Sequence, residues 1–310
     1  MELVVIGHKN PDTDSIVSSM IVSYYSDSLF GHHAVAKRAG ELNNETKFVL
    51  DHIAKPTIRL PELLEKVNEE NVILVDTTEP TQLIDGINEN NLFAVIDHHN
   101  LGGLKSSKPI YARIEPLGCT CTILYKILKE KNLEITQEVA CLMASAIISD
   151  TLFLNSPTTT DEDRIILEEL NKIAGLNLEN YSMEMFKAKS SLEGIETTEI
   201  IEKDYKFFEM GKSKVGIGVW ETVVPETVNE RKEEILKALK NKKQKEGLDY
   251  LFFGVVDIIK ENTYLYLVGD EEINLAKEIF NGNLENNVMF AEHIVSRKKQ
   301  IVPPLKEKLE

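Results

Sequence analysis

Residues 4–15 read VVIGHKNPDTDS, a short β-branched run that leads through a glycine into one histidine and two aspartates. Three further apolar segments end in the same kinds of side chain: VILV at 72–75 before Asp76, FAVI at 93–96 before Asp97, His98 and His99, and ASAIIS at 144–149 before Asp150. Ligands bind at the carboxyl ends of the strands in an open parallel sheet. The four segments are therefore expected to converge on one cleft.

Strand-like and helix-like segments alternate along the chain, which indicates βαβ units. Strands are expected at 3–6, 72–75, 93–96, 215–219, 250–256 and 264–268, and helices at 15–25, 61–69, 120–130, 138–150, from about 162, and at 228–241. Asp14 or Ser15 is expected to cap the helix that begins near Ile16. The fold class that we expect is α/β, with a mostly parallel N-terminal sheet flanked by helices and a smaller C-terminal α/β domain.

The apolar periodicity is lost between residues 187 and 194, where we place a hinge. We expect a metal-binding domain at 1–188, a linker at 189–195 and a substrate-clamping domain at 196–310, with the active site between the domains.

The composition is that of a globular protein, with 42% hydrophobic and 28% charged residues and a net charge of -16. This acidic balance disfavours extended nucleic acid as a partner. No apolar run is long enough to span a membrane, and a strand at the very start leaves no room for a signal peptide. Three cysteines without paired spacing indicate reduced thiols rather than disulfides. We therefore expect a cytoplasmic protein.

Six side chains form the candidate metal site: His8, Asp12, Asp14, Asp76, His98 and Asp150. Their four carboxylates would offset the charge of two divalent ions, and a mixture of imidazole and carboxylate suits Mn, Fe, Co or Zn better than Mg. A pair of ions can hold a bridging water, lower its pKa and direct it at phosphorus. Hydrolysis of a phosphate compound is the expected chemistry.

Each of these residues alone has an ordinary explanation, because aspartates at the ends of strands are usually turn or cap residues. The joint pattern of His-x-x-x-Asp-x-Asp and Asp-His-His after strands favours one metal centre. Residues 297–299 read RKK, which is either an anion clamp or a solvated surface run. The N–H groups of residues 118–120 either bind a phosphate or belong to a plain helix start. The basic residues 240–245 are expected to be the end of a helix.

The motifs GHKNPDTDS at 7–15, DHH at 97–99 and SD at 149–150 resemble those of the DHH phosphoesterase superfamily. Within it, SRKKQ at 296–300 is similar to the signature of the family II inorganic pyrophosphatases, the manganese- or cobalt-dependent type, and EPLGCT at 115–120 agrees as well. The resemblance covers nearly the whole chain, and the C-terminal signature is its specific part. It implies hydrolysis of pyrophosphate to two phosphates by a metal-bridged hydroxide in a two-metal site.

The resemblance also implies roles for individual residues. His8 and Asp12 would bind one ion, Asp14, His98 and Asp150 the other, and Asp76 would bridge the two. His99 and Asp76 would be catalytic, and the substrate would be held by His99, Lys206, Arg297 and Lys298. Two Mn²⁺ or Co²⁺ ions per subunit, Mg²⁺ accompanying the substrate, and a homodimer are further expectations.

The chain departs from the family pattern after the bridging aspartate. It reads DTTEP at 76–80, where the family commonly has His-Asn-Glu, so Thr77 cannot supply the acid–base role of an imidazole. We expect altered metal tuning or rate rather than a lost reaction. Two alternatives stay open. One is another phosphoesterase of the superfamily acting on polyphosphate or small nucleotides, although its glycine-rich motif is missing. The other is a regulatory protein that binds without turnover.

Overall fold

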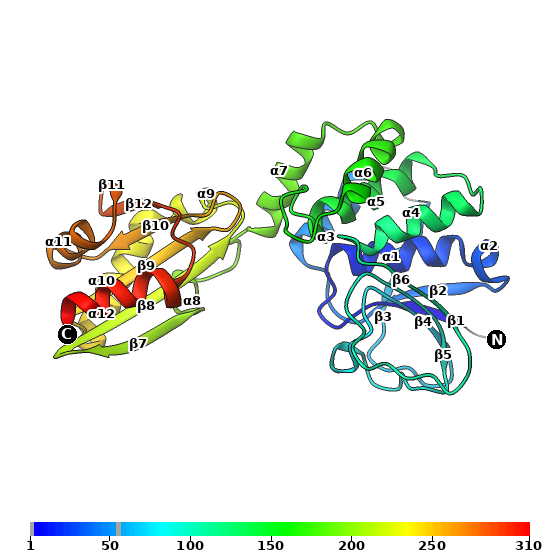
Figure 1. Ribbon diagram of the computed structural model, residues 1–310, viewed down its shortest axis with the longest axis horizontal. Helices are drawn as coiled ribbons and strands as arrows, with labels where there is room; N and C mark the ends of the chain where they lie inside the picture. Colours follow the sequence, from blue (N-terminus) through cyan, green and yellow to red (C-terminus); the bar gives the residue numbers. More distant parts are fainter. Residues whose placement is uncertain (1–2, 54–56) are drawn as a thin grey trace. The chain divides into compact units, whose positions relative to one another are not determined.

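The structure is a computed structural model that describes residues 3–53 and 57–310. The chain forms two compact units, Met1–Lys189 and Ser190–Glu310 (Figure 1). The boundary coincides with the end of a helix at Lys189. The hinge role of residues 189–195 stays a prediction.

The first unit is built on a sheet in which every pair of neighbouring strands is parallel. Its strands are β1 (Leu3–Ile6), β2 (Ala34–Arg38), β3 (Glu62–Leu63), β4 (Asn71–Val75), β5 (Leu92–Asp97) and β6 (Tyr111–Ile114). The order is β3-β2-β1-β4-β5-β6, so the chain first adds strands on one side of β1 and then on the other. The point where the order reverses, between β1 and β4, is where such sheets bind ligands.

Helices cover one face of this sheet, and loops cover the other. The helical elements of the unit are α1 (Thr13–Tyr24), α2 (Ser26–Phe30), α3 (Asn44–His52), η1 (Pro80–Gln82), α4 (Thr120–Glu130), α5 (Gln137–Asp150), α6 (Asp161–Ala174) and α7 (Leu178–Lys189). Helix α1 packs on β1 and β2 and also against α5, which explains why both helices are buried on nearly all sides. On the opposite face, Leu64, Ile87 and Leu104 from loops pack against the core cluster that contains Val72 and Leu74. Because α1 and α5 are locked in the core, the side chains at their ends are held firmly.

The second unit has a mixed sheet in the order β11-β12-β10-β9-β8-β7, where only β8 and β9 run parallel within the described ranges. The strands are β7 (Tyr205–Met210), β8 (Ser213–Thr222), β9 (Tyr250–Asp257), β10 (Asn262–Leu267), β11 (Gly282–Glu285) and β12 (Val288–Glu292). The helices are α8 (Thr197–Glu202), α9 (Glu226–Asn229), α10 (Lys232–Glu246), α11 (Asp270–Ile279), η2 (Arg297–Ile301) and α12 (Val302–Leu309). Leu251 and Phe253 pack toward α8 and α10, whereas Phe252 packs toward α11 and α12. Alternate residues of β9 therefore bury both faces of the sheet.

The predicted α/β class, with its parallel first sheet, is confirmed. The helix predicted at 61–69 is wrong. The Leu64 N–H donates to the Arg38 carbonyl at 2.9 Å and the Val67 N–H to the Asp85 carbonyl at 2.9 Å, because this segment pairs with its neighbours as extended chain. The first helix also begins earlier than predicted, with Asp12 as its cap. The helix predicted at 228–241 is divided into α9 and α10.

Among the described residues, no helix is both long enough and apolar enough to cross a lipid bilayer.

Candidate metal centre

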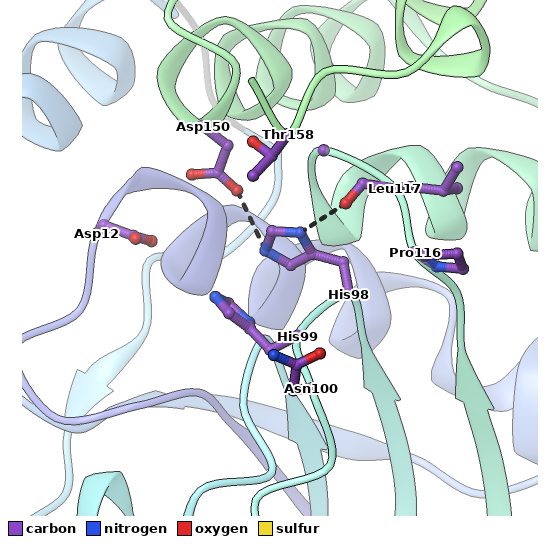
Figure 2. Close-up of a pocket in the computed structure, with 9 residues that line it drawn as sticks. Asp12, His98, His99, Asn100, Pro116, Leu117, Asp150 and Thr158 are labelled. Carbon is purple, nitrogen blue, oxygen red and sulfur yellow. Dashed lines mark hydrogen bonds and ion pairs between the residues drawn. The ribbon is translucent and has the colours of Figure 1, made fainter. Parts of the chain in front are cut away.

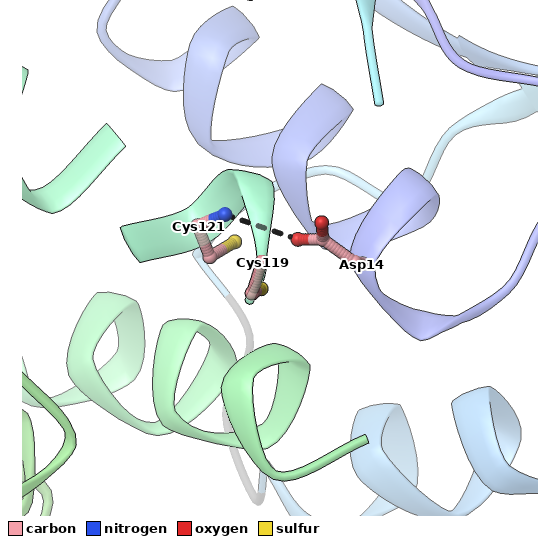
Figure 3. A group of neighbouring side chains, drawn as sticks. All are labelled: Asp14, Cys119 and Cys121. Atoms are coloured by element: carbon pink, nitrogen blue, oxygen red, sulfur yellow. Dashed lines mark hydrogen bonds between the residues drawn. The ribbon is translucent and has the colours of Figure 1, made fainter. Parts of the chain in front are cut away.

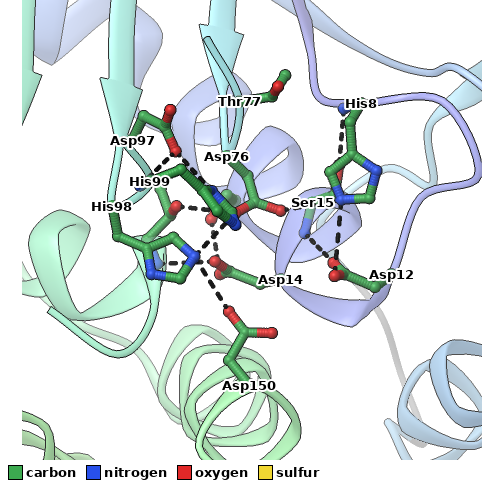
Figure 4. Close-up of polar contacts among 12 residues, drawn as sticks. His8, Asp12, Asp14, Ser15, Asp76, Thr77, Asp97, His98, His99 and Asp150 are labelled. Carbon is green, nitrogen blue, oxygen red and sulfur yellow. Dashed lines mark hydrogen bonds and ion pairs between the residues drawn. The ribbon is translucent and has the colours of Figure 1, made fainter. Parts of the chain in front are cut away.

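The six predicted ligands lie together at the carboxyl edge of the parallel sheet (Figure 4). His8 follows β1, Asp76 follows β4 directly and His98 follows β5 directly. Helix ends supply the other three: Asp12 caps α1, Asp14 lies in its first turn, and Asp150 is the last residue of α5. The strands end side by side because they are parallel, and α1 and α5 bring their termini to the same place.

The ligand atoms form two groups that share Asp76. In the first, His8 Nε2 lies 3.6 Å from Asp12 Oδ2 and 3.3 Å from Asp76 Oδ2. In the second, His98 Nε2 lies 3.3 Å from Asp76 Oδ1 and 3.6 Å from Asp150 Oδ2, and Asp14 is also present. Within each group the candidate ligand atoms are within 4.8 Å of one another. Each carboxylate oxygen of Asp76 thus faces a different group.

The carboxylates are crowded with little water to separate their charges. Burial and the charges of Asp14 and Asp12 raise the pKa of Asp76 to about 6, despite hydrogen bonds from His8 and His98. Burial and the same neighbouring charges raise the pKa of Asp150 as well. The Oδ2 atom of Asp76 is buried and has no hydrogen bond within the part of the chain that is described. A buried oxygen left without a donor beside several acids fits a cation-binding site.

The two imidazoles respond to these acids in the opposite direction. Burial opposes a charge on His8, but hydrogen bonds and charges from Asp12 and Asp76 outweigh it and raise its pKa to about 11. For His98, burial is outweighed by Asp76 and Asp14, and the pKa rises to about 9. The Nδ1 atom of His98 lies 2.9 Å from the Leu117 carbonyl, which leaves Nε2 directed at the carboxylates (Figure 2). Such a bond from the second ring nitrogen is typical of a metal-binding histidine.

The start of α4 holds Asp14 in place (Figure 3). The Thr120 and Cys121 N–H groups donate to its two oxygens at 2.7 and 3.1 Å, and Ser18 Oγ donates at 3.0 Å. Thr120 Oγ1 also donates to Asp76 Oδ1 at 3.2 Å. Phosphate binding by the N–H groups of Gly118 and Thr120 is therefore wrong, because the first donates to Asp163 Oδ2 at 2.9 Å and the second to Asp14.

The three cysteines are free thiols. Cys119 and Cys121 are buried beside Asp14, but burial raises the pKa of Cys121 to about 11 and that of Cys119 well above its usual range. Both are therefore protonated core thiols. Cys141 is only partly buried.

Asp76 has a left-handed backbone, with φ of 60°, although it is buried. Non-glycine residues adopt this conformation rarely, and aspartate is one of the few that tolerates it. The strained conformation turns the chain sharply at the end of β4 and presents the carboxylate to both ligand groups. Such outliers cluster at functional sites.

His99 lies beside the ligands with half of its side chain exposed, 54%. Its Nδ1 lies 2.9 Å from Asp97 Oδ1, and its backbone N–H donates to the same oxygen at 3.1 Å. Hydrogen bonds and the charge of His99 outweigh the effect of burial and lower the pKa of Asp97, so Asp97 is a carboxylate that orients the ring. We did not predict a site role for Asp97, although its place in the DHH motif was a signal.

A pocket of about 490 Å³ opens beside this centre (Figure 2). Its walls include the predicted residues Asp12, His98, His99 and Asp150. Asn100 and Thr158 also line it, and their sequence context gave no signal for this. The pocket is small and is bordered by candidate metal ligands, so a compact ligand with metal-binding oxygens suits it better than a polymer.

Thr77 does not line this pocket. Its side chain is 1% exposed, and its hydroxyl donates to Gln82 Oε1 at 3.0 Å and accepts from the Glu79 N–H at 3.2 Å. At this position the chain therefore has a turn-stabilising residue. The expected effect of Thr77 on metal tuning or rate stays a prediction.

The second unit has its own polar pocket of about 460 Å³, lined by Lys206, Arg297 and Lys298 among others. Lys299 is not among the residues that line it. The Arg297 side chain is only 11% exposed, and its guanidinium donates to Asp204 Oδ1 at 2.8 Å and to the Asp204 carbonyl. Asp204 was not predicted. Asp204 therefore occupies part of the hydrogen-bonding capacity of Arg297. Lys206 and Lys298 are the better candidates for binding an anion in this pocket.

The sequence and structure resemble known proteins over nearly their full length. Residues 2–147 match the family model "DHH family, N-terminal domain", and residues 183–308 match the DHHA2 domain. A manganese-dependent inorganic pyrophosphatase of Methanocaldococcus jannaschii is 40% identical, covering 97% of each chain. One of Bacillus subtilis is also 40% identical, covering 98% of this chain and 97% of its own. A crystal structure from Methanococcus jannaschii, assigned to the family II inorganic pyrophosphatases, has 38% identity, 99% coverage of each chain and a TM-score of 0.62.

Proposed function

The chain belongs to the DHH family, in its branch of manganese-dependent inorganic pyrophosphatases, and from this membership we propose that it hydrolyses inorganic pyrophosphate to two phosphates at a centre of two divalent ions. The observation that carries the two-ion proposal is the sharing of Asp76 between two groups of ligand atoms. One group contains His8 and Asp12, and the other contains Asp14, His98 and Asp150.

The donor set supports manganese as the resident metal. Imidazole combined with carboxylate suits Mn²⁺ or Co²⁺, whereas Mg²⁺ prefers oxygen ligands and usually keeps several waters. We include Co²⁺ as an alternative ion and Mg²⁺ as a companion of the substrate phosphates. Ions held there would lower the pKa of a water molecule and neutralise phosphate oxygens, which is the chemistry that cleavage of a phosphoric anhydride needs.

His99 is the candidate for contact with the departing phosphate. Asp97 accepts from its Nδ1 side, so the Nε2 atom is left to face the pocket, where it can donate to a phosphate oxygen. The hydrogen bond that the His99 ring donates to Asp97, opposed by burial and by the His98 charge, raises the pKa of His99, which favours the proton-bearing imidazole. A donor fixed in position contributes most to phosphoryl transfer through charge stabilisation.

Lys206 and Lys298 are the candidates for binding the phosphates in the second unit, with Arg297 beside them. Pyrophosphate carries several negative charges in a small volume, so cations that are not already paired are suitable clamps. We propose that the two pockets face the same substrate after closure of the units. Small-angle scattering with and without a non-hydrolysable analogue such as imidodiphosphate checks this, and superimposable profiles would contradict closure.

The substrate is tested by comparing phosphate release from pyrophosphate, short polyphosphate and a dinucleotide with the Mn²⁺-loaded protein. We expect pyrophosphate to be preferred by kcat/KM, and a chelator to abolish turnover until Mn²⁺ is restored. Preference for polyphosphate or the dinucleotide would favour another phosphoesterase activity of the same superfamily. Tight Mn²⁺ binding without any turnover would favour a regulatory role.

The bridging role of Asp76 is tested by Asp76→Asn. We expect a loss of about 10³-fold in kcat, comparable to removal of a key charge-stabilising group, and binding of at most one Mn²⁺ per chain by metal analysis under anaerobic conditions. Asp51→Asn is the matched control, because Asp51 is an exposed aspartate of the same unit. Two ions bound per chain with full turnover in Asp76→Asn would rule out the bridge.

We further propose that the protein is a homodimer in the cytoplasm. Within the described ranges, β6 pairs with β5 on one side only, so its other edge is open to a second copy. Three free thiols are consistent with a reducing compartment. Light scattering after size exclusion measures the mass of the assembly.

A further inference from the structure

Glu45, on α3, is a fully buried carboxylate that is not one of the candidate ligands; its side chain is 0% exposed. Its Oε2 atom has three partners: Thr13 Oγ1 donates at 3.3 Å, Ser149 Oγ donates at 2.7 Å, and Lys189 Nζ lies 3.2 Å away. The Oε1 atom is buried and has no hydrogen-bond partner in the described chain. A carboxylate in such a place needs a structural or functional reason, because desolvation is costly.

The partners of Glu45 lie next to candidate metal ligands in the sequence. Thr13 stands between Asp12 and Asp14, and Ser149 directly precedes Asp150. The hydroxyl of Thr13 is also 3.1 Å from Thr46 Oγ1, which is next to Glu45 on α3. A single carboxylate therefore ties the start of α1 to the end of α5, and these two helix ends carry three of the four candidate acidic ligands.

Lys189 supplies the positive charge. It is the last residue of α7 and of the first unit, and its side chain is 41% exposed while its amino group reaches the buried acid. Helix α3 packs against both α7 and α5, so the three helices meet at this ion pair. Removing the lysine leaves the buried Glu45 carboxylate without its counter-charge, which is more harmful than replacing both partners.

We propose that Glu45 and Lys189 are positioning residues that hold the helix ends bearing Asp12, Asp14 and Asp150 at the spacing that Mn²⁺ binding needs. We call the Glu45–Lys189 ion pair the brace. It also connects these helix ends to the segment that leads into the second unit, because Ser190 follows Lys189 directly. This inference rests on the proposed metal centre and adds two residues outside its ligand set.

The test measures Mn²⁺ affinity by titration calorimetry on the metal-free full-length protein. Lys189→Met should weaken Mn²⁺ binding by about 10- to 100-fold, the usual cost of losing a residue that orients metal ligands. Lys189→Arg keeps the charge and should remain within about 3-fold of the unchanged protein. The double variant Glu45→Gln with Lys189→Met should recover part of the lost affinity, because no uncompensated acid is left.

Lys37→Met is the matched control. It removes another lysine of the first unit, whose Nζ lies 2.9 Å from Glu62 Oε2 between β2 and β3, and it should leave Mn²⁺ affinity unchanged. Melting of each metal-free variant is recorded alongside. Unchanged Mn²⁺ affinity in Lys189→Met would overturn the proposed role of the brace. Equal losses of Mn²⁺ affinity in Lys189→Met and Lys37→Met would overturn it as well. Failure of the unchanged protein to bind Mn²⁺ would instead overturn the proposed metal centre.

Discussion

Single residues at the sheet edge are held in states that they would avoid in water. Asp76 combines a left-handed backbone, full burial and an oxygen without a hydrogen bond among the described residues, and three other acids, Asp12, Asp14 and Asp150, share its neighbourhood. Their mutual repulsion is relieved in the metal-free protein by protons on His8 and His98. In the proposed centre, metal ions would therefore compete with protons for one set of atoms.

This competition gives a prediction for pH dependence. The pKa values of His8 and His98, about 11 and about 9, mean that both imidazoles carry a proton below these values in the metal-free protein. Because ligation needs neutral rings, Mn²⁺ binding at pH 7.5 should release about two protons. Affinity should fall as the pH is lowered, and further near pH 6, where Asp76 begins to take up a proton. Calorimetry in two buffers of different ionisation enthalpy measures the release, and a buffer-independent enthalpy would contradict it.

The pocket of the second unit gives a second prediction, because its cations differ in their partners. Lys298→Met should raise KM for pyrophosphate by about 10- to 100-fold, since a charged hydrogen bond contributes about 1.5–3 kcal/mol, with little effect on melting. Arg297→Met should raise KM and also lower the melting temperature, because Arg297 is nearly buried and bound to Asp204. Steady-state kinetics and thermal melts separate the two. Equal changes in KM and in melting temperature for both variants would contradict this prediction.

Residues at strand ends were predictable, and residues that orient them were not. Asp76 follows an apolar run directly and His8 and His98 follow one residue later, so the parallel sheet alone places them together. Asp204 and Asn100 reach their sites through loop conformations that depend on distant contacts. No local pattern in the sequence encodes such contacts.

At the scale of elements, helix ends rather than helix bodies build the centre. The start of α6 illustrates how they are fixed. Thr160 and Asp163 form a capping box there, and the buried Asp163 carboxylate also accepts from the Gly118 N–H at 2.9 Å and from Thr122 Oγ1 at 2.6 Å. This single side chain therefore joins α6 to the loop that lines the pocket and to α4.

We predict that loss of this junction destabilises the protein. Asp163→Ala should lower the free energy of unfolding by about 3 kcal/mol, because several buried donors lose their acceptor and the cap is lost. Asp161→Ala, which changes an exposed acid in the first turn of the same helix, should cost less than about 1 kcal/mol. Urea unfolding of both variants gives the comparison. A loss of similar size in both variants would show that the junction contributes little.

Elements with strong periodicity and clear boundaries were predicted well, as β1, β4, β5, α4 and α5 show. The segment 61–69 was predicted as a helix because its apolar spacing is helical, yet backbone pairing with Arg38 and Asp85 keeps it extended. Tertiary pairing overrides local propensity in such short segments. Edge strands such as β3, β6 and β11 were not predicted, because they are short and partly exposed.

At the scale of the whole molecule, the six candidate ligands belong to the first unit alone. Added Mn²⁺ should therefore raise the melting temperature of this unit and leave the second unit unchanged. At a free concentration 100 times Kd, one bound ion stabilises by about 2.7 kcal/mol, which corresponds to about 5–10 °C for a unit of this size. Scanning calorimetry of the metal-free and Mn²⁺-loaded protein measures both transitions. An equal shift of the two transitions would contradict the prediction.

The spread of these ligands along the chain affects the order in which a cell can make the enzyme. His8 emerges from the ribosome early, whereas Asp150 emerges only when most of the first unit has been synthesised. Domains generally fold as units during translation, the N-terminal one first. A nascent chain therefore exposes an incomplete set of acids for much of its synthesis, and the full coordination set exists before translation of the second unit is finished. All six candidate ligands are accordingly present late in the synthesis of the first unit, but early in that of the whole polypeptide.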